Sequence, residues 1–334
     1  MHVDVVVPVW NRPAETRNCL VRLVSDCADC RVIIIDNGSE RETEALLEEL
    51  ADGLNERALL IRNENNIGFV RAVNEGLARV TAPFAAVMRP TTEAGEGWLA
   101  AILHLAAARP EAGIILPSRD HGSPPFDREA SHGAFDAMFL RGRMLEAIGG
   151  FDETLDGAAW CLKDYSRRAF AAGYTTVVSA SSRVHASAEP ELGSEARRRE
   201  LHERSRSEYE RRWGTEKSYF IEVVSEDGES LLREHAGAVE TAARLGHRVT
   251  LLLHRRLSRN LGREKFIAPH ESIGIIALPA LLAERAREKA WQKERSHAPD
   301  AVRISASERN GADLAAFADE ILRLQRERFH GTSP

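Results

Sequence analysis

Residues 66–77 read Asn-Ile-Gly-Phe-Val-Arg-Ala-Val-Asn-Glu-Gly-Leu, and the segments on either side make sense only as parts of the same half-domain. Gly68 allows a tight backbone turn, and the small and apolar residues after it recur at helical spacing. Arg71 and Asn74 therefore project from the other face of a predicted helix. Because the first N–H groups of a helix have no partner within it, this place suits a phosphate group. Taken alone, such a pattern usually marks a loop and a core helix, so its meaning depends on the flanking sequence.

An alternation of strands and helices surrounds this stretch. Apolar runs rich in β-branched residues predict strands at 3–9, 32–35 and 58–62, and amphipathic patterns predict helices at 15–23 and 43–54. Alternation of this kind predicts right-handed crossovers and a parallel sheet. In such a sheet, ligands bind at the carboxyl ends of the strands.

Polar turns follow each of these strands. They are Trp10-Asn11-Arg12, Asp36-Asn37-Gly38-Ser39 and Asn65-Asn66-Ile67-Gly68. No G-x-G-x-x-G motif follows the first strand, so the sequence lacks the dinucleotide-binding fingerprint. Asp36 is placed to accept a hydrogen bond from a ribose or a base, and an Asp that only makes its own turn is the equal alternative.

Three motifs in this order resemble the nucleotide-sugar half of family-2 glycosyltransferases, which have the GT-A fold. They are Val-Val-Val-Pro-Val-Trp-Asn-Arg at 5–12, Ile-Ile-Ile-Asp-Asn-Gly-Ser at 33–39 and the stretch at 66–78. The resemblance implies an α/β fold with a mixed, mostly parallel sheet. It also implies a hexosyltransferase of polysaccharide biosynthesis that moves a sugar from a UDP-, GDP- or dTDP-linked donor to an unknown acceptor. The implied donor-binding residues are Pro8, Trp10, Asn11, Asp36 (on the pyrimidine), Gly68, Arg71 and Thr91.

The metal-binding part of the family pattern is altered. Family members carry an Asp-x-Asp motif whose carboxylates hold Mn²⁺ or Mg²⁺ against the donor diphosphate. Here the two positions read Arg89 and Thr91, and Glu93 is the nearest carboxylate. Either Arg89 supplies the positive charge as a catalytic residue, or the site no longer performs the reaction. His185 resembles a family residue that often completes the metal site, and a structural or surface histidine is the alternative.

The acidic pair that family members carry after a Gly-Gly-Phe-Asp-Glu segment is altered too. The segment is present at 149–153, but the positions of the pair read Cys161 and Leu162. An inverting transferase needs a base near the acceptor hydroxyl, so Asp164 becomes the candidate catalytic residue. Its alternative role is a cap at the start of a helix. Two further aspartates stand behind it: Asp152 and Asp156.

A second α/β unit begins near residue 218. Apolar runs predict strands at 219–224, 248–253, 273–278 and 301–305, and helical patterns predict helices at 230–245, 281–293 and 312–329. This Rossmann-like alternation predicts a smaller C-terminal domain. The strongly charged segment 195–213 predicts a solvent-exposed helix that leads out of the first domain, so we expect domains at 1–215 and 216–334. Formation of a homodimer and binding of an acceptor carrier are the roles considered for the second domain.

The composition fits a globular protein of two domains. The chain has 334 residues with 45 basic and 51 acidic side chains, so no basic footprint predicts nucleic acid or an anionic membrane as the main partner. No apolar run approaches the roughly 18 residues of a membrane span, and no signal-peptide pattern opens the sequence. We therefore expect a cytoplasmic protein. In that compartment Cys27 and Cys30 are expected to be two free thiols, with a zinc or redox pair as the alternative.

Two functions follow from these observations. In the first, the protein is a glycosyltransferase in which Arg89 takes over part of the role of the metal. In the second, it is a catalytically degenerate member of the family that binds a nucleotide sugar or a protein partner. The ordered motifs between residues 3 and 185 favour the first function, whereas the loss of both acidic motifs favours the second.

Overall fold

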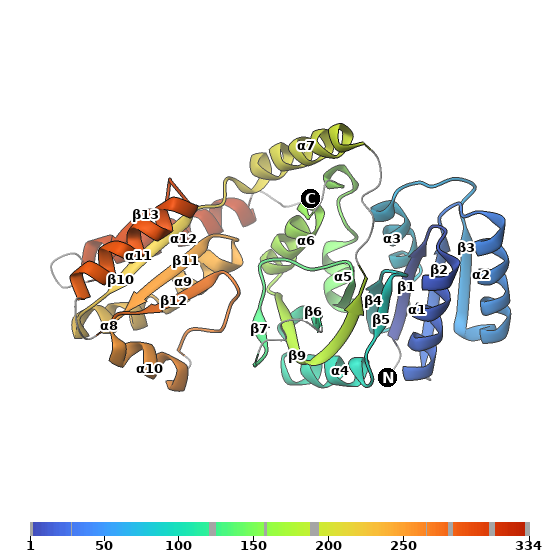
Figure 1. Cartoon of the computed structure of the whole chain (residues 1–334), viewed down its shortest axis with the longest axis horizontal. Coiled ribbons are helices and arrows are strands. Elements are labelled where there is room, and N and C mark those ends of the chain that lie inside the picture. The colour runs from blue at the N-terminus through green and yellow to red at the C-terminus, as the bar shows by residue number, and fades with distance from the viewer. Residues whose placement is uncertain are drawn as a thin grey trace. The chain divides into compact units, whose positions relative to one another are not determined.

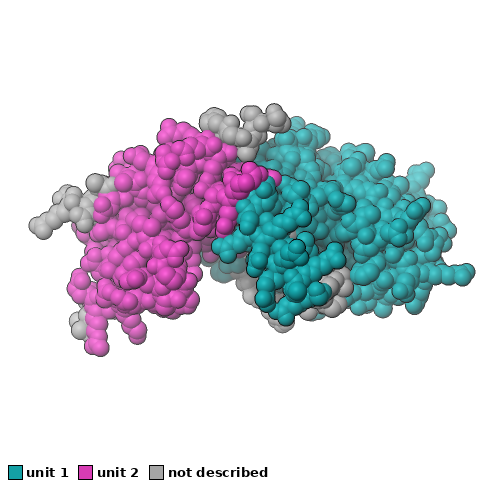
Figure 2. Space-filling view, turned by 90° about the horizontal axis from the view of Figure 1, so that it is seen from above, with its two compact units in different colours: residues 1–128, 132–209 teal, residues 129–131, 210–334 magenta. Residues whose placement is uncertain are grey.

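The computed structural model describes residues 3–27, 29–119, 125–156, 159–187, 194–264, 266–279, 283–306 and 311–330. The chain forms two compact units, which Figure 2 shows in different colours. The first unit contains residues 1–128 and 132–209, and the second contains residues 129–131 and 210–334. Each unit has its own sheet and its own hydrophobic core.

The first unit is built on a nine-stranded sheet with the strand order β3-β2-β1-β4-β8-β6-β9-β5, and β7 pairs with β9. The strands are β1 (Val3–Val9), β2 (Cys30–Asp36), β3 (Ala58–Arg62), β4 (Phe84–Met88), β5 (Thr92–Ala94), β6 (Ala112–Arg119), β7 (Arg128–Glu129), β8 (Ala137–Arg141) and β9 (Thr175–Ala186). Strands β3, β2, β1 and β4 run parallel to one another, whereas β8 is antiparallel to β4 and β6. The mixed α/β architecture (Figure 1) confirms the expected fold class.

Helices connect these strands, and the last helix follows β9 and ends at residues of the second unit. They are α1 (Pro13–Asp26), α2 (Arg41–Leu54), α3 (Phe69–Leu77), α4 (Trp98–Ala108), α5 (Gly142–Ile148), α6 (Trp160–Ala171) and α7 (Glu195–Trp213), with 3-10 turns η1 (Asn55–Arg57) and η2 (Glu153–Leu155). Because α1 leads from β1 to the parallel strand β2, the carboxyl ends of both strands lie at the same edge of the sheet. Within the described part of the chain, no helix has both the length and the apolar content needed to cross a membrane.

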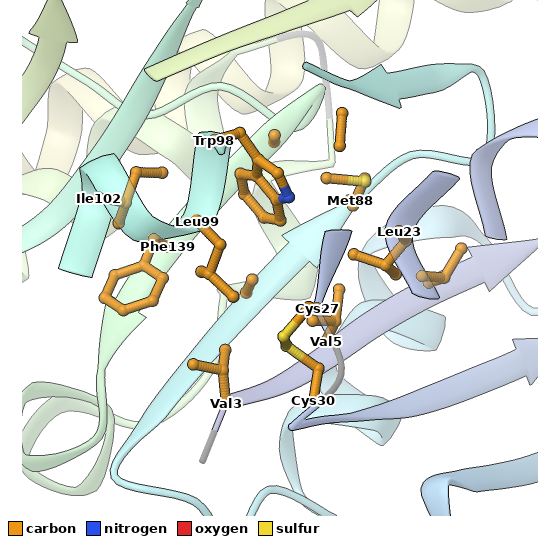
Figure 3. Close-up of a cluster of buried hydrophobic side chains, with 14 of the residues drawn as sticks. Val3, Val5, Leu23, Cys27, Cys30, Met88, Trp98, Leu99, Ile102 and Phe139 are labelled. Carbon is orange, nitrogen blue, oxygen red and sulfur yellow. A yellow bond between two sulfur atoms is a disulfide. The ribbon is translucent and has the colours of Figure 1, made fainter. Parts of the chain in front are cut away.

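Side chains of β1 point alternately to the two faces of the sheet, and helices pack on both faces. Val5 joins a core cluster with Leu23 of α1 and Trp98 of α4 (Figure 3). Val6 points to the other face, where α3 packs. A β-carbon on Gly76 would lie 2.3 Å from Val6 Cγ1, so glycine at this position lets α3 approach β1 closely. Residues 69–77 thus form a helix that packs closely against the central strand.

One charged residue lies in this buried strand. Asp4 accepts hydrogen bonds from Arg31 Nε at 3.0 Å and Nη2 at 2.6 Å, and from the backbone N–H groups of Thr81 at 2.7 Å and Ala82 at 3.1 Å. Burial favours the neutral carboxyl, but these hydrogen bonds outweigh burial and lower the pKa of Asp4. The carboxylate therefore fastens the amino end of β1 to β2 and to the segment before β4.

Cys27 and Cys30 form a disulfide (Figure 3), so the expectation of two free thiols is wrong. Cys27 follows the last turn of α1 and Cys30 begins β2. Their Cα atoms lie 5.5 Å apart, a separation that a disulfide spans. The C-x-x-C spacing is compatible with thiols, a metal or a bridge, and the tight return from α1 into β2 brings the two sulfurs together.

The second unit is a four-stranded parallel sheet with the strand order β12-β11-β10-β13. Its elements are β10 (Ser218–Val223), α8 (Glu226–Glu234), α9 (Ala236–Arg244), β11 (Arg248–Leu253), α10 (Arg255–Glu264), β12 (Ile273–Ala277), α11 (Ala283–His297), β13 (Val302–Ser305) and α12 (Gly311–His330). One face of the sheet packs against α11, where Phe220 and Leu252 contact Trp291 and its neighbours. This arrangement confirms the expected Rossmann-like pattern.

Two helices of this unit differ from the sequence-based expectation. The single helix predicted at 230–245 is two helices, α8 and α9, that meet at His235. The Ser225 side chain accepts a hydrogen bond from the Gly228 N–H at 3.1 Å, so α8 begins earlier than its apolar pattern suggests. Helix α10 was not predicted, because its sequence is dominated by arginine and polar residues and contains few apolar ones.

Residues 129–131 belong to the second unit although the chain on both sides of them belongs to the first. Glu129 accepts hydrogen bonds from Arg244 at 2.6 and 2.9 Å, and the Ser131 N–H donates to Glu271 at 2.8 Å. These partners lie 115 and 140 residues away in the sequence. No local pattern could therefore have predicted that this segment joins the second unit.

Candidate functional site

A cavity of about 310 Å³ opens at the carboxyl edge of the first unit's sheet. Its walls come from the ends of β1 and β4, the turn after β2 and the start of α3: Pro8, Val9, Trp10, Asn11, Arg12, Asn37, Asn66, Gly68, Phe69, Arg89 and Pro90. The strand–helix alternation predicted that these turns would meet. Among the described residues that line the cavity, both charged ones, Arg12 and Arg89, are cations. The cavity therefore suits an anionic ligand.

The turn after β1 has an unusual backbone that the turn after β2 holds in place. Asn11 and Arg12 have φ angles of 58° and 59°, in the left-handed region that residues other than glycine rarely adopt. The Asn11 N–H donates to Ser39 Oγ at 2.9 Å, and Asn11 Oδ1 accepts from the Glu40 N–H at 2.8 Å. Backbone conformations of this kind are typical of ligand-binding sites, where surrounding contacts maintain them.

Asn37 holds the loop that leads into α3. Its Oδ1 accepts a hydrogen bond from the Ile67 N–H at 3.0 Å, and its Nδ2 donates to Asn66 Oδ1 at 3.0 Å and to the Gly68 carbonyl at 3.3 Å. Because the Asn37 side chain is buried, these bonds form away from water and keep the cavity wall in one conformation. Asn37 was not among the predicted site residues, although its position at a strand end was a usable signal.

Gly68 begins α3 at the cavity wall. Its φ angle of 96° lies in the region that favours glycine, and its N–H donates to Asn66 Oδ1 at 2.9 Å. Helix α3 starts at the next residue, Phe69, which also lines the cavity. The positive end of the helix dipole therefore lies at this wall and adds to the attraction for an anion.

Arg89 brings a cation to the cavity. Its guanidinium carbon lies 4.9 Å from the centroid of the Phe69 ring and 6.0 Å from that of Phe135. The rings of Phe135 and Phe151 are 5.2 Å apart, and those of Phe151 and Tyr165 are 4.2 Å apart. This row of aromatic rings supports the guanidinium from one side through a cation–π contact and holds it at the cavity wall.

The sequence of the first unit matches the family model described as "Glycosyl transferase family 2" over residues 4–169. This domain belongs to glycosyl transferase family 2. The matched range contains all the residues that line the cavity, so the resemblance drawn from the motifs is confirmed. No curated protein sequence matches the chain.

Solved glycosyltransferases have the same fold as this family-2 protein. GalNAc-T7 with UDP, GalNAc and Mn²⁺ matches with a TM-score of 0.53 at 13% identity, over 64% of this chain and 49% of the other. The mannosyltransferase PcManGT from Pyrobaculum calidifontis, in complex with GDP-Man and Mn²⁺, matches with a TM-score of 0.50 at 17% identity, over 96% of this chain and 86% of the other. This chain thus spans about half the length of GalNAc-T7. The likeness confirms the GT-A fold.

The residues of this family-2 domain do not fit a divalent cation at the usual place. Within the described residues, no group of three or more His, Cys, Asp and Glu could hold a metal ion. Thr91 is buried, and Glu93 of β5 lies opposite His185 of β9 where these two strands pair. At the Asp-x-Asp positions, the residue that lines the cavity is Arg89, and a guanidinium has no lone pair to offer to Mn²⁺ or Mg²⁺.

Asp164 lies in the second turn of α6 and not at its start, so its alternative role as a helix-start cap is wrong. The side chain is fully buried and accepts a hydrogen bond from Arg168 Nε at 2.8 Å. Arg168 also donates to the carbonyls of Ile148 at 2.6 Å and Gly150 at 2.8 Å. The ion pair thus fastens α6 to the Gly-Gly-Phe-Asp-Glu segment. Asp164 lies outside the cavity lining, and its role as a catalytic base stays a prediction.

The structure brings some of the expected donor-binding residues together and separates others. Asp36 is buried, and its Oδ1 accepts from the Ser39 N–H at 2.9 Å, so it makes its own turn. Arg71 lies on the exposed face of α3 and pairs with Glu153 at 3.0 Å, while Thr91 is buried outside the lining. The remaining four line the cavity: Pro8, Trp10, Asn11 and Gly68. Sequence reasoning missed Phe69, because an aromatic residue inside a helical pattern is usually part of the core.

Proposed function

We propose that the family-2 domain transfers a sugar from a nucleoside-diphosphate donor to an acceptor without a divalent cation, and that Arg89 neutralises the diphosphate. One observation carries this proposal: the described residues that line the cavity include two arginines and no carboxylate. A diphosphate gains negative charge as its bond to the sugar breaks. A guanidinium held in place before the reaction stabilises that charge through charge-assisted hydrogen bonds.

Two further features of the cavity support a nucleotide donor. Helix α3 directs its positive end to the cavity wall, where a phosphate is favoured. Trp10 lines the cavity with 38% of its surface exposed and offers a flat apolar face to a base. Because GalNAc-T7 was solved with UDP and PcManGT with GDP-Man, UDP and GDP are the first nucleotides to test, followed by dTDP. The acceptor and a homodimer through the second unit stay predictions.

The test is calorimetry of the full chain with UDP, GDP and dTDP, each with and without Mn²⁺. We expect one nucleotide to bind equally well in both conditions. Arg89→Ala should weaken that binding by roughly 10- to 150-fold, the loss expected for hydrogen bonds to a charged group. Arg17→Ala is the matched control, since Arg17 lies on the exposed surface of α1 and pairs with Glu49. Binding that requires Mn²⁺, or that Arg89→Ala leaves unchanged, would contradict the role proposed for Arg89.

Binding of a nucleotide sugar without transfer is the second candidate function. The observation that favours it is the environment of the altered acidic motif, where Cys161 and Leu162 are buried and Asp164 is held in an internal ion pair. This function predicts that the donor nucleotide binds but that the donor sugar is never released. An assay of nucleotide-sugar hydrolysis that measures the released nucleoside diphosphate therefore distinguishes the two functions.

A further inference from the structure

Asp156 lies beside the cavity where α3 begins. Its Oδ2 is 3.7 Å from the position that a β-carbon on Gly68 would occupy. Gly68 lines the cavity, and its φ angle of 96° disfavours any residue with a side chain. Glycine at this position therefore leaves the Asp156 carboxylate next to the cavity wall without a side chain between them.

The charged and titratable neighbours of Asp156 come from three elements. Partial burial raises the pKa of Asp156 to about 6, and Glu153 of η2 adds to this shift while Arg71 of α3 opposes it. Cys161 of α6 lies close enough for the charge of Asp156 to raise its pKa, in addition to the larger effect of burial. Since Cys161 occupies a position of the family's acidic pair, Asp156 brings a carboxylate to the same neighbourhood from another point of the chain.

We infer that Asp156 is the catalytic base that accepts the proton of the acceptor hydroxyl, an inference that rests on the proposed function. The other carboxylates of the segment already form contacts within the protein. Asp164 is fully buried in an ion pair, Asp152 caps η2 and Glu153 pairs with Arg71. Asp156 therefore combines a side chain that is still reached by solvent with a place next to Gly68, a residue of the cavity wall.

Arg89 and Asp156 lie beside consecutive residues at the start of α3. The Asp156 carboxylate approaches Gly68, and the guanidinium of Arg89 lies against the ring of Phe69. A cation for the leaving group and an anion for the attacking group are thus both supplied at one helix end. Two such groups are what a single displacement at the sugar requires.

The transfer step begins at the acceptor hydroxyl. Its O–H bond breaks and the proton moves to the Asp156 carboxylate, while the oxygen forms a bond to the anomeric carbon of the donor sugar. The bond between the anomeric carbon and the β-phosphate oxygen breaks, and its electron pair leaves with the nucleoside diphosphate. The guanidinium of Arg89 stabilises the negative charge that develops on the β-phosphate oxygen. With water in place of the acceptor, the products are the free sugar and the nucleoside diphosphate.

The experiment uses water as the acceptor probe, because hydrolysis of the donor needs no knowledge of the natural acceptor. The full chain is assayed with the nucleotide sugar that matches the tightest nucleotide, and kcat and KM are measured between pH 5 and 8. Asp156→Asn should lower kcat by roughly 10²- to 10⁴-fold, the usual contribution of a general base. Its KM for the donor should stay within about twofold, since catalysis and binding separate in this way when a transition-state group is lost.

The dependence of kcat on pH distinguishes a catalytic carboxylate from a structural one, because removal of a structural carboxylate would leave the acid limb in place. In the wild-type protein kcat should fall as the pH drops through about 6, because only the unprotonated carboxylate accepts a proton. Asp156→Asn should lose this acid limb, whereas Asp156→Glu should keep a carboxylate and part of the activity. Asp152→Asn is the matched control, because asparagine keeps the oxygen that accepts from the Thr154 N–H at 2.9 Å.

The outcomes separate this inference from the proposed function. Hydrolysis by the wild-type protein that Asp156→Asn leaves intact would overturn the inference alone. Nucleotide binding without hydrolysis in the wild-type protein would overturn both, in favour of a binding module. If Asp156→Asn loses its thermal unfolding transition, Asp156→Glu replaces it. A lower kcat with a retained acid limb in Asp156→Glu, beside an unchanged kcat in Asp152→Asn, would support the inference. An unchanged kcat in both variants would overturn it.

Discussion

Asn74 is bound in both directions to the backbone of Phe151: its Nδ2 donates to the Phe151 carbonyl at 2.9 Å, and its Oδ1 accepts from the Phe151 N–H at 2.8 Å. The two residues are 77 positions apart in the sequence. A β-carbon on Gly150 would lie 2.5 Å from Asn74 Oδ1, so glycine permits this contact. The helix that begins at the cavity thereby holds the segment that carries Asp156.

Replacing Asn74 should weaken this connection. Asn74→Ala removes both hydrogen bonds and leaves the partly enclosed carbonyl and N–H of Phe151 unsatisfied, so we expect a loss of about 1–3 kcal/mol in the free energy of unfolding. Urea denaturation measures this loss, and kcat for donor hydrolysis should fall with it. Asn18→Ala, at an exposed position of α1, should change stability by less than about 0.5 kcal/mol. Equal stability of the two variants would mean that the contact contributes little.

Two glycines in helices should respond in opposite ways to alanine. Gly76→Ala places a methyl group 2.3 Å from Val6 Cγ1 in the closely packed contact between α3 and β1, and should destabilise the protein by about 1–3 kcal/mol. Gly53→Ala, in α2, meets no atom of the described residues within 4 Å and should stabilise it by about 0.5–1 kcal/mol, because alanine has the higher helix propensity. Thermal unfolding of both variants tests this prediction, and a stabilising Gly76→Ala would contradict the packing argument.

The buried pair of Asp4 and Arg31 should make stability depend on pH. Because the pKa of Asp4 is lower in the folded protein than in the unfolded chain, its contribution is present above the unfolded pKa and is lost as the pH falls through the folded pKa. Asp4→Asn should cost roughly 3 kcal/mol at pH 7, the loss expected when one partner of a buried ion pair is removed. The difference between the variant and the wild-type protein should shrink in acid.

Denaturation at pH 7 and at pH 3 measures this change. Glu49→Gln is the control, because the pair of Glu49 and Arg17 is largely exposed and should contribute less than about 1 kcal/mol at either pH. A constant difference between Asp4→Asn and the wild-type protein across this range would show that the stabilisation does not come from the charge of the carboxylate.

Much of the first unit could be predicted from local patterns. The strand expected at 3–9 is β1, and the helix expected from the spacing after Gly68 is α3. Family membership follows from motifs that each occupy one strand end, so every motif could be read without knowledge of the others' positions. The break between α8 and α9 at His235 was missed, because one apolar pattern runs through both helices.

The site was less predictable, because the partner of each polar side chain decides what that side chain can do. Asp36 and Asp164 both have the residue type and the sequence position that a site requires, yet one makes a turn and the other an ion pair with Arg168. Asp156 had the weaker sequence signal, and it is the one that lies beside the cavity at Gly68. Asn37 and Phe69 line the cavity through contacts that join separate strand ends.

The alternation of strands and helices, the family, and the presence of Arg89 and Thr91 where the family pattern has carboxylates could all be read from the sequence. These properties depend on residue type and on spacing within a few turns of chain, which periodicity records directly. The folded chain was needed to show which charged groups line the cavity, which are paired in the interior, and that Cys27 and Cys30 are bonded. Burial and hydrogen bonding set the charge and reach of a side chain, and both are supplied by partners that lie tens of residues away.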